Sequence, residues 1–375
     1  MNTELNEFTQ NDLQLLLHLQ EDPLQTYSKI ASNLGKSVKT VSRWISRLEK
    51  NKLFHPVRAI FNYSLLNLEV HDLILDIPSL KNVKKIESFV DNFPYSLYRV
   101  RLNGATNGLY IQFRSPLNTK SLYEDIINLM KKEDLIHNSH LFTSSEPTIT
   151  TKFNLNYWDN NSMEWKFDWD EWEESMYERN IEKLPKIRKL KFIESLFQKL
   201  DKIDMFLLRL LNENAKMKLK EIENRLKKDL NITESLQRLS ERVQFLKKNF
   251  VIDYRLYLNR KVLDIYNTLL LDITCSENII SRLKSQIFLN PPPFPGHFKS
   301  NLEKFLWYMS LPATHFSKIS SLMWKQELKE YKVSFVDYSS VYSYYFWEEI
   351  YDQDNKSWKV DRNFIYNEPI KYLLD

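Results

Sequence analysis

The strongest constraint on how this 375-residue chain can fold is a sequence pattern that occurs twice. Asp12, Ile30 and Leu34 each recur as the same residue type 192 positions later. Further along, the segment 245–252 (FLKKNFVI) overlays the segment 47–54 (RLEKNKLF) at a separation of 198, so the second copy has about six extra residues in between. Internal similarity over such a distance predicts a chain built from two copies of one set of domains.

Each copy begins with a stretch whose apolar spacing predicts a helix-turn-helix. In the first copy, Thr26–Phe54 reads as two short helices joined at Gly35, with apolar residues at three- and four-residue steps: Ile30, Leu34, Val38, Val41, Ile45 and Leu48. The opposite face of the second helix carries cations and a hydroxyl: Lys36, Lys39, Thr40, Arg43, Arg47 and Lys50. Such a helix suits the major groove of DNA, and a solvated amphipathic helix is the simpler alternative.

A second pattern follows each helix-turn-helix and predicts the order β-α-β-β-α-β. In the first copy, the strands are expected at Val70–Ile77, Tyr95–Leu102, Leu109–Phe113 and His140–Ser144, and the helices at Lys81–Phe93 and Leu122–Met130. In the second copy, the strands are expected at Thr268–Ile273, Phe305–Met309 and Val333–Tyr338, and the helices at Glu277–Leu289 and Phe316–Leu328. This order predicts an antiparallel sheet with both helices on one face.

A tryptophan-rich stretch comes after each predicted sheet domain. The first holds Trp158, Trp165, Trp169 and Trp172 among many acids, and Trp347 and Trp358 echo it near the C-terminus. Acidic residues would be repelled by phosphates, so these stretches are not expected to contact DNA. A stacking pocket for a flat ligand is one interpretation. Burial against the sheet domain, as a strap across it, is the favoured one.

Composition is that of a globular protein, with 43% hydrophobic and 27% charged residues. The net charge of +4 is mild, so nucleic-acid binding would have to come from local patches. The single cysteine, Cys275, excludes an internal disulfide and a cysteine-based zinc site. No apolar run approaches the roughly 18 residues that a membrane span needs, and the polar N-terminus is not a secretory signal. We therefore expect a cytoplasmic protein without a membrane partner.

The helix-turn-helix stretches, SKIASNLGKSVKTVSRWISRLEKNKLF and LDKIDMFLLRLLNENAKMKLKEIENRL, resemble the winged helix-turn-helix of the Lrp/AsnC (leucine-responsive regulatory protein) family. The β-α-β-β-α-β stretches resemble that family's ligand-sensing, dimer-forming ACT-like domain. The resemblance implies a sequence-specific, DNA-binding transcription regulator. Two copies in one chain imply an α+β fold with two winged helix-turn-helix domains and two ferredoxin-like sheet domains, arranged as an intramolecular pseudo-dimer.

These patterns divide the chain into six segments. They are a first winged helix-turn-helix at 1–64, a first sheet domain at 65–147, a Trp-rich acidic segment with a basic linker helix at 148–195, a second winged helix-turn-helix at 196–260, a second sheet domain at 261–346 and an aromatic C-terminal segment at 347–375. The second DNA contact would then be intramolecular, which raises its effective concentration. Whether the chain is a monomeric pseudo-dimer or also forms a homodimer stays open.

Double-stranded DNA is the expected partner, and the predicted contacts lie on the two recognition helices and the two wing strands. They are Lys36, Lys39, Thr40, Arg43, Arg47 and Arg58 in the first copy, and Thr233, Gln237, Arg238, Arg242 and Arg255 in the second. The second set lies among more acids, so we expect the first copy to supply most of the affinity for DNA. Replacing Arg43 and Arg47 should therefore weaken DNA binding more than replacing Arg238 and Arg242.

Resemblance to the family also points to a candidate effector turn between the second and third strands of each sheet domain. In the first copy this turn holds Gly104, Asn107 and Gly108; in the second copy we place Gly296 and His297 there. The acid that amino-acid-binding members carry in this turn is absent from Ala105–Asn107, and the glycines alone could serve to shape a hairpin. A small-molecule effector of unknown identity is therefore kept as a hypothesis.

The sequence gives less support to an enzymatic function. Four glycines in the whole chain leave no phosphate-binding loop, and His137 and His140 lack a third metal ligand nearby. We expect no catalytic residues, no metal site, no cofactor and no enzyme. Two alternatives stay open: a tetrapyrrole-binding enzyme resembling the sirohaem decarboxylases, which share this architecture, and a scaffold protein that has lost DNA binding.

Overall fold

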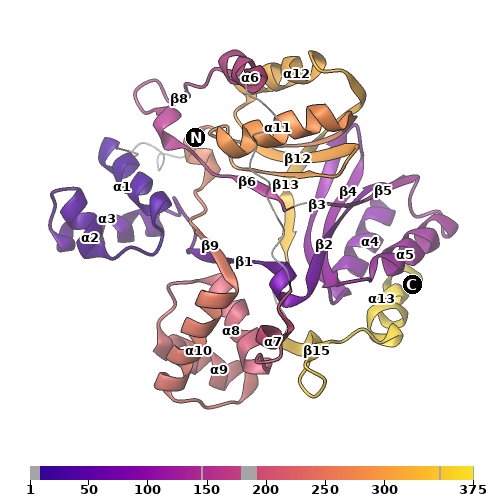
Figure 1. Ribbon diagram of the computed structural model, residues 1–375, viewed down its shortest axis with the longest axis horizontal. Helices are drawn as coiled ribbons and strands as arrows, with labels where there is room; N and C mark the ends of the chain where they lie inside the picture. Colours follow the sequence, from indigo (N-terminus) through magenta and orange to yellow (C-terminus); the bar gives the residue numbers. More distant parts are fainter. Residues whose placement is uncertain (1–8, 145–146, 179–191, 346–347, 375) are drawn as a thin grey trace. The chain divides into compact units, whose positions relative to one another are not determined.

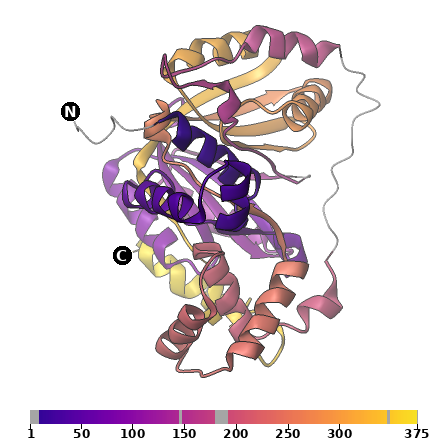
Figure 2. The same ribbon diagram turned by 90° about the vertical axis from the view of Figure 1, so that its left-hand side faces the viewer.

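The computed structural model describes residues 9–144, 147–178, 192–345 and 348–374. The chain forms two compact units (Figures 1 and 2). Unit 1 contains residues 1–67, 191–263 and 345–359, and unit 2 contains residues 68–190, 264–344 and 360–375. The fold is α+β, as predicted, with two winged helix-turn-helix folds in unit 1 and two β-α-β-β-α-β halves in unit 2. None of the helices in the described ranges is long and apolar enough to span a bilayer.

Unit 1 consists of two three-helix groups and a pair of strands. The first winged helix comprises α1 (Gln10–Glu21), α2 (Tyr27–Asn33), α3 (Val38–Lys50) and β1 (Arg58–Phe61). The second comprises α8 (Lys202–Glu213), α9 (Leu219–Leu230), α10 (Leu236–Asn249) and β9 (Val251–Arg255). Figure 2 shows the two helical groups in indigo and rose. Short segments complete the unit: η1 (Tyr63–Leu66), α7 (Glu194–Phe197), η4 (Arg260–Leu263), η6 (Glu348–Ile350), β14 (Tyr351–Asp352) and β15 (Ser357–Trp358).

The two recognition helices, α3 and α10, start in the same way but follow different turns. Ser37 caps α3 and Ser235 caps α10, each accepting a hydrogen bond from the backbone N–H three residues later. In the first winged helix the turn is short, and Gly35 adopts a φ of +62°, which favours glycine. In the second, the extra residues near 227–232 extend α9 to 12 residues, against seven in α2, instead of lengthening only the turn.

The wing strands pair with each other. We predicted that Arg58–Tyr63 would form a wing beside its own recognition helix, but β1 pairs antiparallel with β9, with Arg58 opposite Arg255. Backbone hydrogen bonds continue the ladder from His55 to Tyr257 (2.8 Å) and from Asn259 to Leu53 (2.8 Å). The reason is that a lone strand leaves its backbone groups unpaired, and the partner winged helix offers a second strand. This ribbon joins the two winged helices of unit 1.

Unit 2 is built on nine strands in one sheet. The first half has β2 (Leu68–Asp76), α4 (Leu80–Asn92), β3 (Ser96–Gly104), β4 (Gly108–Pro116), α5 (Lys120–Lys132) and β5 (Asn138–Thr143). The second half has β10 (Asn267–Cys275), α11 (Glu277–Leu289), β11 (Gly296–Ser300), β12 (Lys304–Leu311), η5 (Ala313–His315), α12 (Phe316–Trp324) and β13 (Leu328–Ser343). The strand order is β5-β2-β4-β3-β13-β10-β12-β11-β6, which gives each half the ferredoxin-like order 4-1-3-2.

Strands that extend from one half into the other connect the two halves at both edges. β13 pairs with β10 of its own half and, from Ser334 onward with an irregularity after Asp337, with β3 of the first half. At the other edge, β6 (Ile149–Thr151) follows β5 in the chain and pairs with β11 of the second half. The two ends of the strand order are therefore neighbouring stretches of chain.

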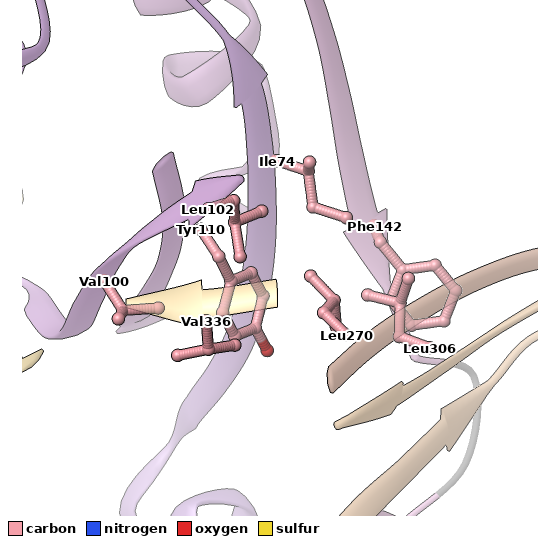
Figure 3. Close-up of a cluster of buried hydrophobic side chains, with 8 residues drawn as sticks. All are labelled: Ile74, Val100, Leu102, Tyr110, Phe142, Leu270, Leu306 and Val336. Atoms are coloured by element: carbon pink, nitrogen blue, oxygen red, sulfur yellow. The ribbon is translucent and has the colours of Figure 1, made fainter. Parts of the chain in front are cut away.

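The helix-free faces of the two halves pack on each other and form the core of unit 2 (Figure 3). Figure 1 shows α4 and α5 on the outside of one half and α11 and α12 on the outside of the other. The core cluster takes its buried side chains from both halves: Ile74, Val100, Leu102, Tyr110 and Phe142 from the first, and Leu270, Leu306 and Val336 from the second. Each half thus buries an apolar face that its own helices do not cover.

A buried ion pair crosses this core. Lys299 of β11 places its Nζ 2.6 Å and 2.8 Å from the two carboxylate oxygens of Asp72 on β2, and the side chains are 8% and 1% exposed. Tyr110 and Gln112 also donate hydrogen bonds to Asp72, at 2.5 Å and 2.8 Å. Burying charges is costly unless they are paired in this way. Asp72 of the first half therefore depends on a cation from the second half.

The Trp-rich segments are straps: the first packs on the second half of unit 2, whereas the second begins in unit 1 and only its C-terminal helix packs on the first half of unit 2. The first contains η2 (Leu155–Tyr157), β7 (Trp158–Asp159), β8 (Glu164–Trp165) and α6 (Trp169–Tyr177), and α6 packs on α11 and α12. The second continues into η7 (Asn363–Asn367) and α13 (Glu368–Leu374), and α13 packs on α4. Both straps bury tryptophans, for example Trp172 at 2% and Trp358 at 3% exposure. Packing on a sheet half accounts for Trp172, in line with the favoured interpretation. Trp358 is instead buried in unit 1, where its Nε1 donates to the backbone oxygen of Leu66 at 2.7 Å, and Trp347 lies outside the described residues.

Two sequence expectations need correction or qualification. Gly296 and His297 do not lie in a turn, because they begin β11, a strand that the proline-rich sequence before it concealed. The turn that joins the second and third strands of this half lies at 301–303. The predicted basic linker helix, Lys183–Lys199, falls largely outside the described residues; within its described part, α7 covers Glu194–Phe197.

The cross-sheet ion pair allows a test of how the halves recognise each other. Replacing Lys299 by Met should destabilise the protein by about 3–5 kcal/mol, because it leaves the Asp72 carboxylate buried without its cation. Adding Asp72→Asn should restore most of this loss, since an amide keeps the bond to Tyr110 without the charge. Urea unfolding of the full chain measures both, and Lys318→Met, which removes a surface pair with Asp170, is the control with an expected effect below about 1 kcal/mol. A double variant as unstable as the single one would contradict this account.

Candidate nucleic-acid interface

Several cations at the start of α3 and along its outer face are exposed to solvent, and Lys50 at its C-terminal end is exposed as well. Lys36, Lys39 and Arg43 are exposed, and within the described ranges of the chain none of them forms an ion pair. They lie around the N-terminal half of the helix, where the unpaired N–H groups of the first turn add partial positive charge. Thr40 is half-buried, and its hydroxyl lies 2.9 Å from that of Ser37. Of the predicted contacts, these three cations are the ones free to meet phosphates or bases.

Arg47 and Arg242 have a different environment from the other predicted contacts. Arg47 forms an ion pair with Asp12, which is fully buried at the start of α1 and belongs to its capping box. Arg242 of α10 donates to Asp201 at 2.9 Å and to Asp204 at 2.8 Å, the two carboxylates that cap α8. In both winged helices an arginine from the recognition helix is thus engaged in holding the first helix.

Arg58 and Arg255 lie in the ribbon between the winged helices. The Arg58 guanidinium lies over the rings of Tyr257 and Tyr345, at 5.4 Å and 5.9 Å from their centroids. Arg255 is bonded to Asp253 at 3.2 Å, with its side chain 15% exposed. Because these guanidinium groups already have aromatic or carboxylate neighbours, they are less available to phosphates than the α3 cations.

On α10 the predicted contacts have acidic partners close by. Arg238 pairs with Glu234 at 3.3 Å, and Gln237 donates to Glu241 at 3.1 Å. Thr233 is exposed in the segment before the helix. The outer face of α10 therefore presents neutralised groups where α3 presents free cations.

Three further residues on the outer face of α3 were missed in the sequence. Val38 is 49% exposed although its spacing placed it on the apolar face, and Ser42 and Ser46 follow it at four-residue steps on the accessible side. Leu236, at the same position of α10, is 42% exposed and was also expected to point inward. Position N1 of a helix precedes the first complete turn, so helical periodicity places it poorly. The exposed methyl groups of Val38 are of the kind that contact thymine.

The candidate effector turn of the first half is tied down by its own neighbours. Gly104 has a φ of +116°, and Asn107 accepts from its backbone N–H at 3.3 Å and donates its own to Asp76 at 3.2 Å. A Cβ at Gly108 would lie 2.1 Å from the backbone oxygen of Leu75. The shape of the hairpin thus accounts for both glycines and for Asn107. In the second half, a Cβ at Gly296 would lie 2.7 Å from the Tyr308 backbone oxygen, and exposed His297 lies 3.2 Å from the Thr150 hydroxyl.

Other titratable groups lie between the sheet halves. His140 of β5 is 3.2 Å from Asp272 of β10, and Lys304 is 3.2 Å from the same carboxylate. Burial raises the pKa of Asp272, but hydrogen bonds and charge from His140 and Lys304 outweigh it, so that the pKa lies below its ordinary value. In the described part of the chain, no three His, Cys, Asp or Glu side chains are grouped to hold a metal ion.

Comparison with known proteins gives one family match and several structural neighbours. Residues 8–53 match the family described as winged helix-turn-helix DNA-binding. Among curated proteins, none matches the sequence. The structure of the sirohaem decarboxylase NirDL is similar over 96% of this chain and 99% of that chain, with 13% identity and a TM-score of 0.52; the same enzyme with an iron-uroporphyrin III analogue gives 0.51. An AsnC family transcriptional regulator from Agrobacterium tumefaciens is similar over 40% of this chain and 98% of that chain, with 20% identity and a TM-score of 0.33.

These findings establish a winged helix-turn-helix DNA-binding domain near the N-terminus and a fold shared with NirDL along almost the whole chain. They also correct one prediction. We expected that the chain would not be an enzyme, and that expectation was wrong, because the solved structures that match it from end to end are those of an enzyme. Absence of a phosphate loop and of a metal-ligand cluster in the sequence excluded only the enzymes that need them.

The Arg242 cluster predicts a pH dependence of the second winged helix. Burial, followed by the charge of Asp201, raises the pKa of Asp204 to about 6. The folded state therefore binds this proton more tightly than the unfolded chain, and the resulting stabilisation is complete below about pH 4 and lost as the pH rises through 6. Relative to wild type, Asp204→Asn should gain stability between pH 5 and 7, by up to ~3 kcal/mol. Hydrogen exchange of α8 and α10 amides measures it, with α1 amides as the control; a difference that does not change with pH would refute the assignment.

Proposed function

We propose that the chain is a DNA-binding transcription regulator of Lrp/AsnC type, and that it binds duplex DNA through the basic outer face of α3. The observation that carries this proposal is the set of three unpaired, exposed cations, Lys36, Lys39 and Arg43, on the recognition helix of a domain that matches a DNA-binding family. Side chains with no internal partner lose no ion pair when they bind phosphate. Their attraction to DNA is therefore not offset by a broken ion pair.

The same face offers groups for both kinds of DNA contact. Lys36 precedes the helix and Lys39 lies in its first turn, where cations and helix N–H groups position a helix against phosphates. Arg43 lies one turn further, and arginine binds the major-groove edge of guanine through two hydrogen bonds. Small Ser42 and Ser46 beside it let the helix backbone approach the bases closely. Together with Val38, these residues form a face that suits the major groove.

We also propose the finer architecture that the sequence suggested. The two winged helices and two ferredoxin-like halves support an internal tandem duplication with ACT-like sheet domains, folded as a pseudo-dimer. A small-molecule effector belongs to this proposal, but its site is not the hairpin at Gly104–Gly108, whose polar groups are already bonded. A genome-wide footprint of the bound DNA would report the length and the symmetry of the site.

The charge of α3 gives a quantitative test. The variant Lys36→Ala, Lys39→Ala, Arg43→Ala should bind duplex DNA much more weakly, and the slope of log K against log salt should become less steep by about 0.9 for each phosphate that the variant no longer neutralises. Fluorescence anisotropy over a salt series measures both quantities. Arg47→Ala is the contrasting variant: it should lower the thermal stability of unit 1, because it leaves the buried Asp12 carboxylate unpaired. An unchanged salt slope in the triple variant would overturn the proposal.

A second candidate function is action on a tetrapyrrole. It is favoured by one observation, the end-to-end likeness of the fold to a sirohaem decarboxylase, which at 13% identity concerns the fold alone. The chain's own groups able to move protons lie between the sheet halves, where Tyr110 donates to Asp72 and His140 faces Asp272. These groups bond to one another, so a ligand would have to replace some of those bonds.

Titration with sirohaem tests this second candidate. If the chain binds the tetrapyrrole, the absorption spectrum of sirohaem should shift and saturate at a fixed stoichiometry, because protein groups replace water around the macrocycle. His140→Ala should weaken the shift, and Lys318→Ala, on the surface of α12, should not. A spectrum that is the same with and without the folded protein would rule this candidate out and leave the DNA-binding proposal untouched.

A further inference from the structure

The two recognition helices differ most at the positions that would face DNA. Their N-caps, Ser37 and Ser235, align them at a separation of 198. At this separation the three free cations of the first helix, Lys36, Lys39 and Arg43, correspond to Glu234, Gln237 and Glu241. The inward residues stay apolar: Val41, Ile45 and Leu48 correspond to buried Leu239, Val243 and Leu246. The helix has kept its packing face while its outer face has changed from three positive charges to two negative ones.

Arg238, the cation beside these positions on α10, corresponds to Thr40 and is neutralised within the helix. Arg238 is 65% exposed but pairs with Glu234 at 3.3 Å, four residues earlier. Gln237 donates its amide to Glu241. To bind a phosphate, Arg238 would have to give up the carboxylate, and Glu241 would repel the phosphate from the position that Arg43 occupies on α3. The two recognition helices therefore differ in the charge of their outer faces, and this difference alone disfavours phosphate binding by α10.

The segment in front of α10 differs as well. α9 is five residues longer than α2, about 7.5 Å of additional helix. Asp229 in this extension pairs with Arg225 at 3.1 Å and lies 3.6 Å from Arg209 of α8. The extension is therefore a fixed part of the second winged helix. It stands at the end of α9 that leads into the recognition helix, where the first winged helix has only the short turn at Gly35.

The second winged helix has another set of contacts, with the C-terminal strap. Arg209 of α8 pairs with Glu348 at 3.0 Å, and Tyr351 donates its hydroxyl to the backbone oxygen of Leu200 at 2.9 Å. Lys356 donates to the same oxygen at 2.9 Å. This fold thus has a structural use that does not need DNA: it holds the strap and, through the β1–β9 ribbon, the first winged helix.

We infer that the chain reads DNA through α3 alone, and that its binding site is a single asymmetric half-site. The second winged helix is a support that has kept the fold and lost the reading face. This inference rests on the proposed DNA binding and goes beyond it, because a regulator with two reading helices would select two half-sites one helical turn apart.

Selection of bound sequences from a random duplex pool, with the full chain, tests the inference. The expected result is one non-palindromic motif that fits one major-groove contact. Two related motifs at a spacing of about 10 base pairs would overturn it. The same selection with the α3 variant Lys36→Ala, Lys39→Ala, Arg43→Ala should lose the motif.

A matched pair of variants separates this inference from the function on which it rests. Gln237→Ala with Arg238→Ala, on the exposed face of α10, should leave the affinity for the selected duplex within about twofold, whereas the α3 variant should lose it. Thermal melts confirm that both variants fold. If both lose affinity equally, the single-reader inference fails and the DNA-binding proposal stands. If the wild-type chain shows no salt-dependent binding to any duplex, the proposed function itself fails.

Discussion

The structure of unit 2 depends on one requirement: each ferredoxin-like half has helices on only one face of its sheet. The opposite face carries Ile74, Val100 and Leu102 in the first half and Leu270 and Leu306 in the second, and apolar surface of this extent must be removed from water. Each half covers the apolar face of the other. Strand pairing also joins the halves: β13 pairs with β3 of the first half, and β6, which follows β5 in the chain, pairs with β11 of the second half. Edge pairing and face packing reinforce the same assembly.

The polar contacts make this assembly specific. Asp72 needs a cation, and its cross-strand partners in its own half, Gln112 of β4 and Phe142 of β5, carry no charge. Two first halves packed together would therefore lack the Lys299 that the second half supplies, and a buried carboxylate would stay unpaired. One half therefore cannot take the place of the other. Because both halves belong to the same chain, each always has the other as its partner, and identical halves are not required.

Sequence patterns predicted most of the fold, whereas the environment of each candidate site residue depends on contacts that these patterns do not contain. Apolar spacing located the helices well, as with Glu277–Leu289, because burial of one face dictates that spacing. It missed β11, a strand that follows four prolines within 291–295 and pairs with strands on both sides. It also could not tell an exposed arginine without an ion pair from one that pairs with a buried carboxylate: Arg43 and Arg47 lie on similar sides of one helix, and only the position of Asp12 distinguishes them. Charge patterns identify a face, whereas partners far along the chain decide how each charge is used.

Corresponding positions differ in both units, between the two halves of unit 2 and between the two winged helices of unit 1. A chain can retain a second winged helix with a different outer face for the following reason. Once two folds are covalently joined, each can lose what the other provides, as long as the contacts that hold the frame are kept. α10 keeps its buried face and Arg242 keeps the cap of α8, while the outer positions have exchanged cations for acids. In the proposed function, the few free cations of this face would give an affinity that falls with salt and little beyond non-specific attraction. Specific binding would then have to come from contacts of Arg43, Val38 and the small serines in one groove, and the rest of the fold would serve to position one helix.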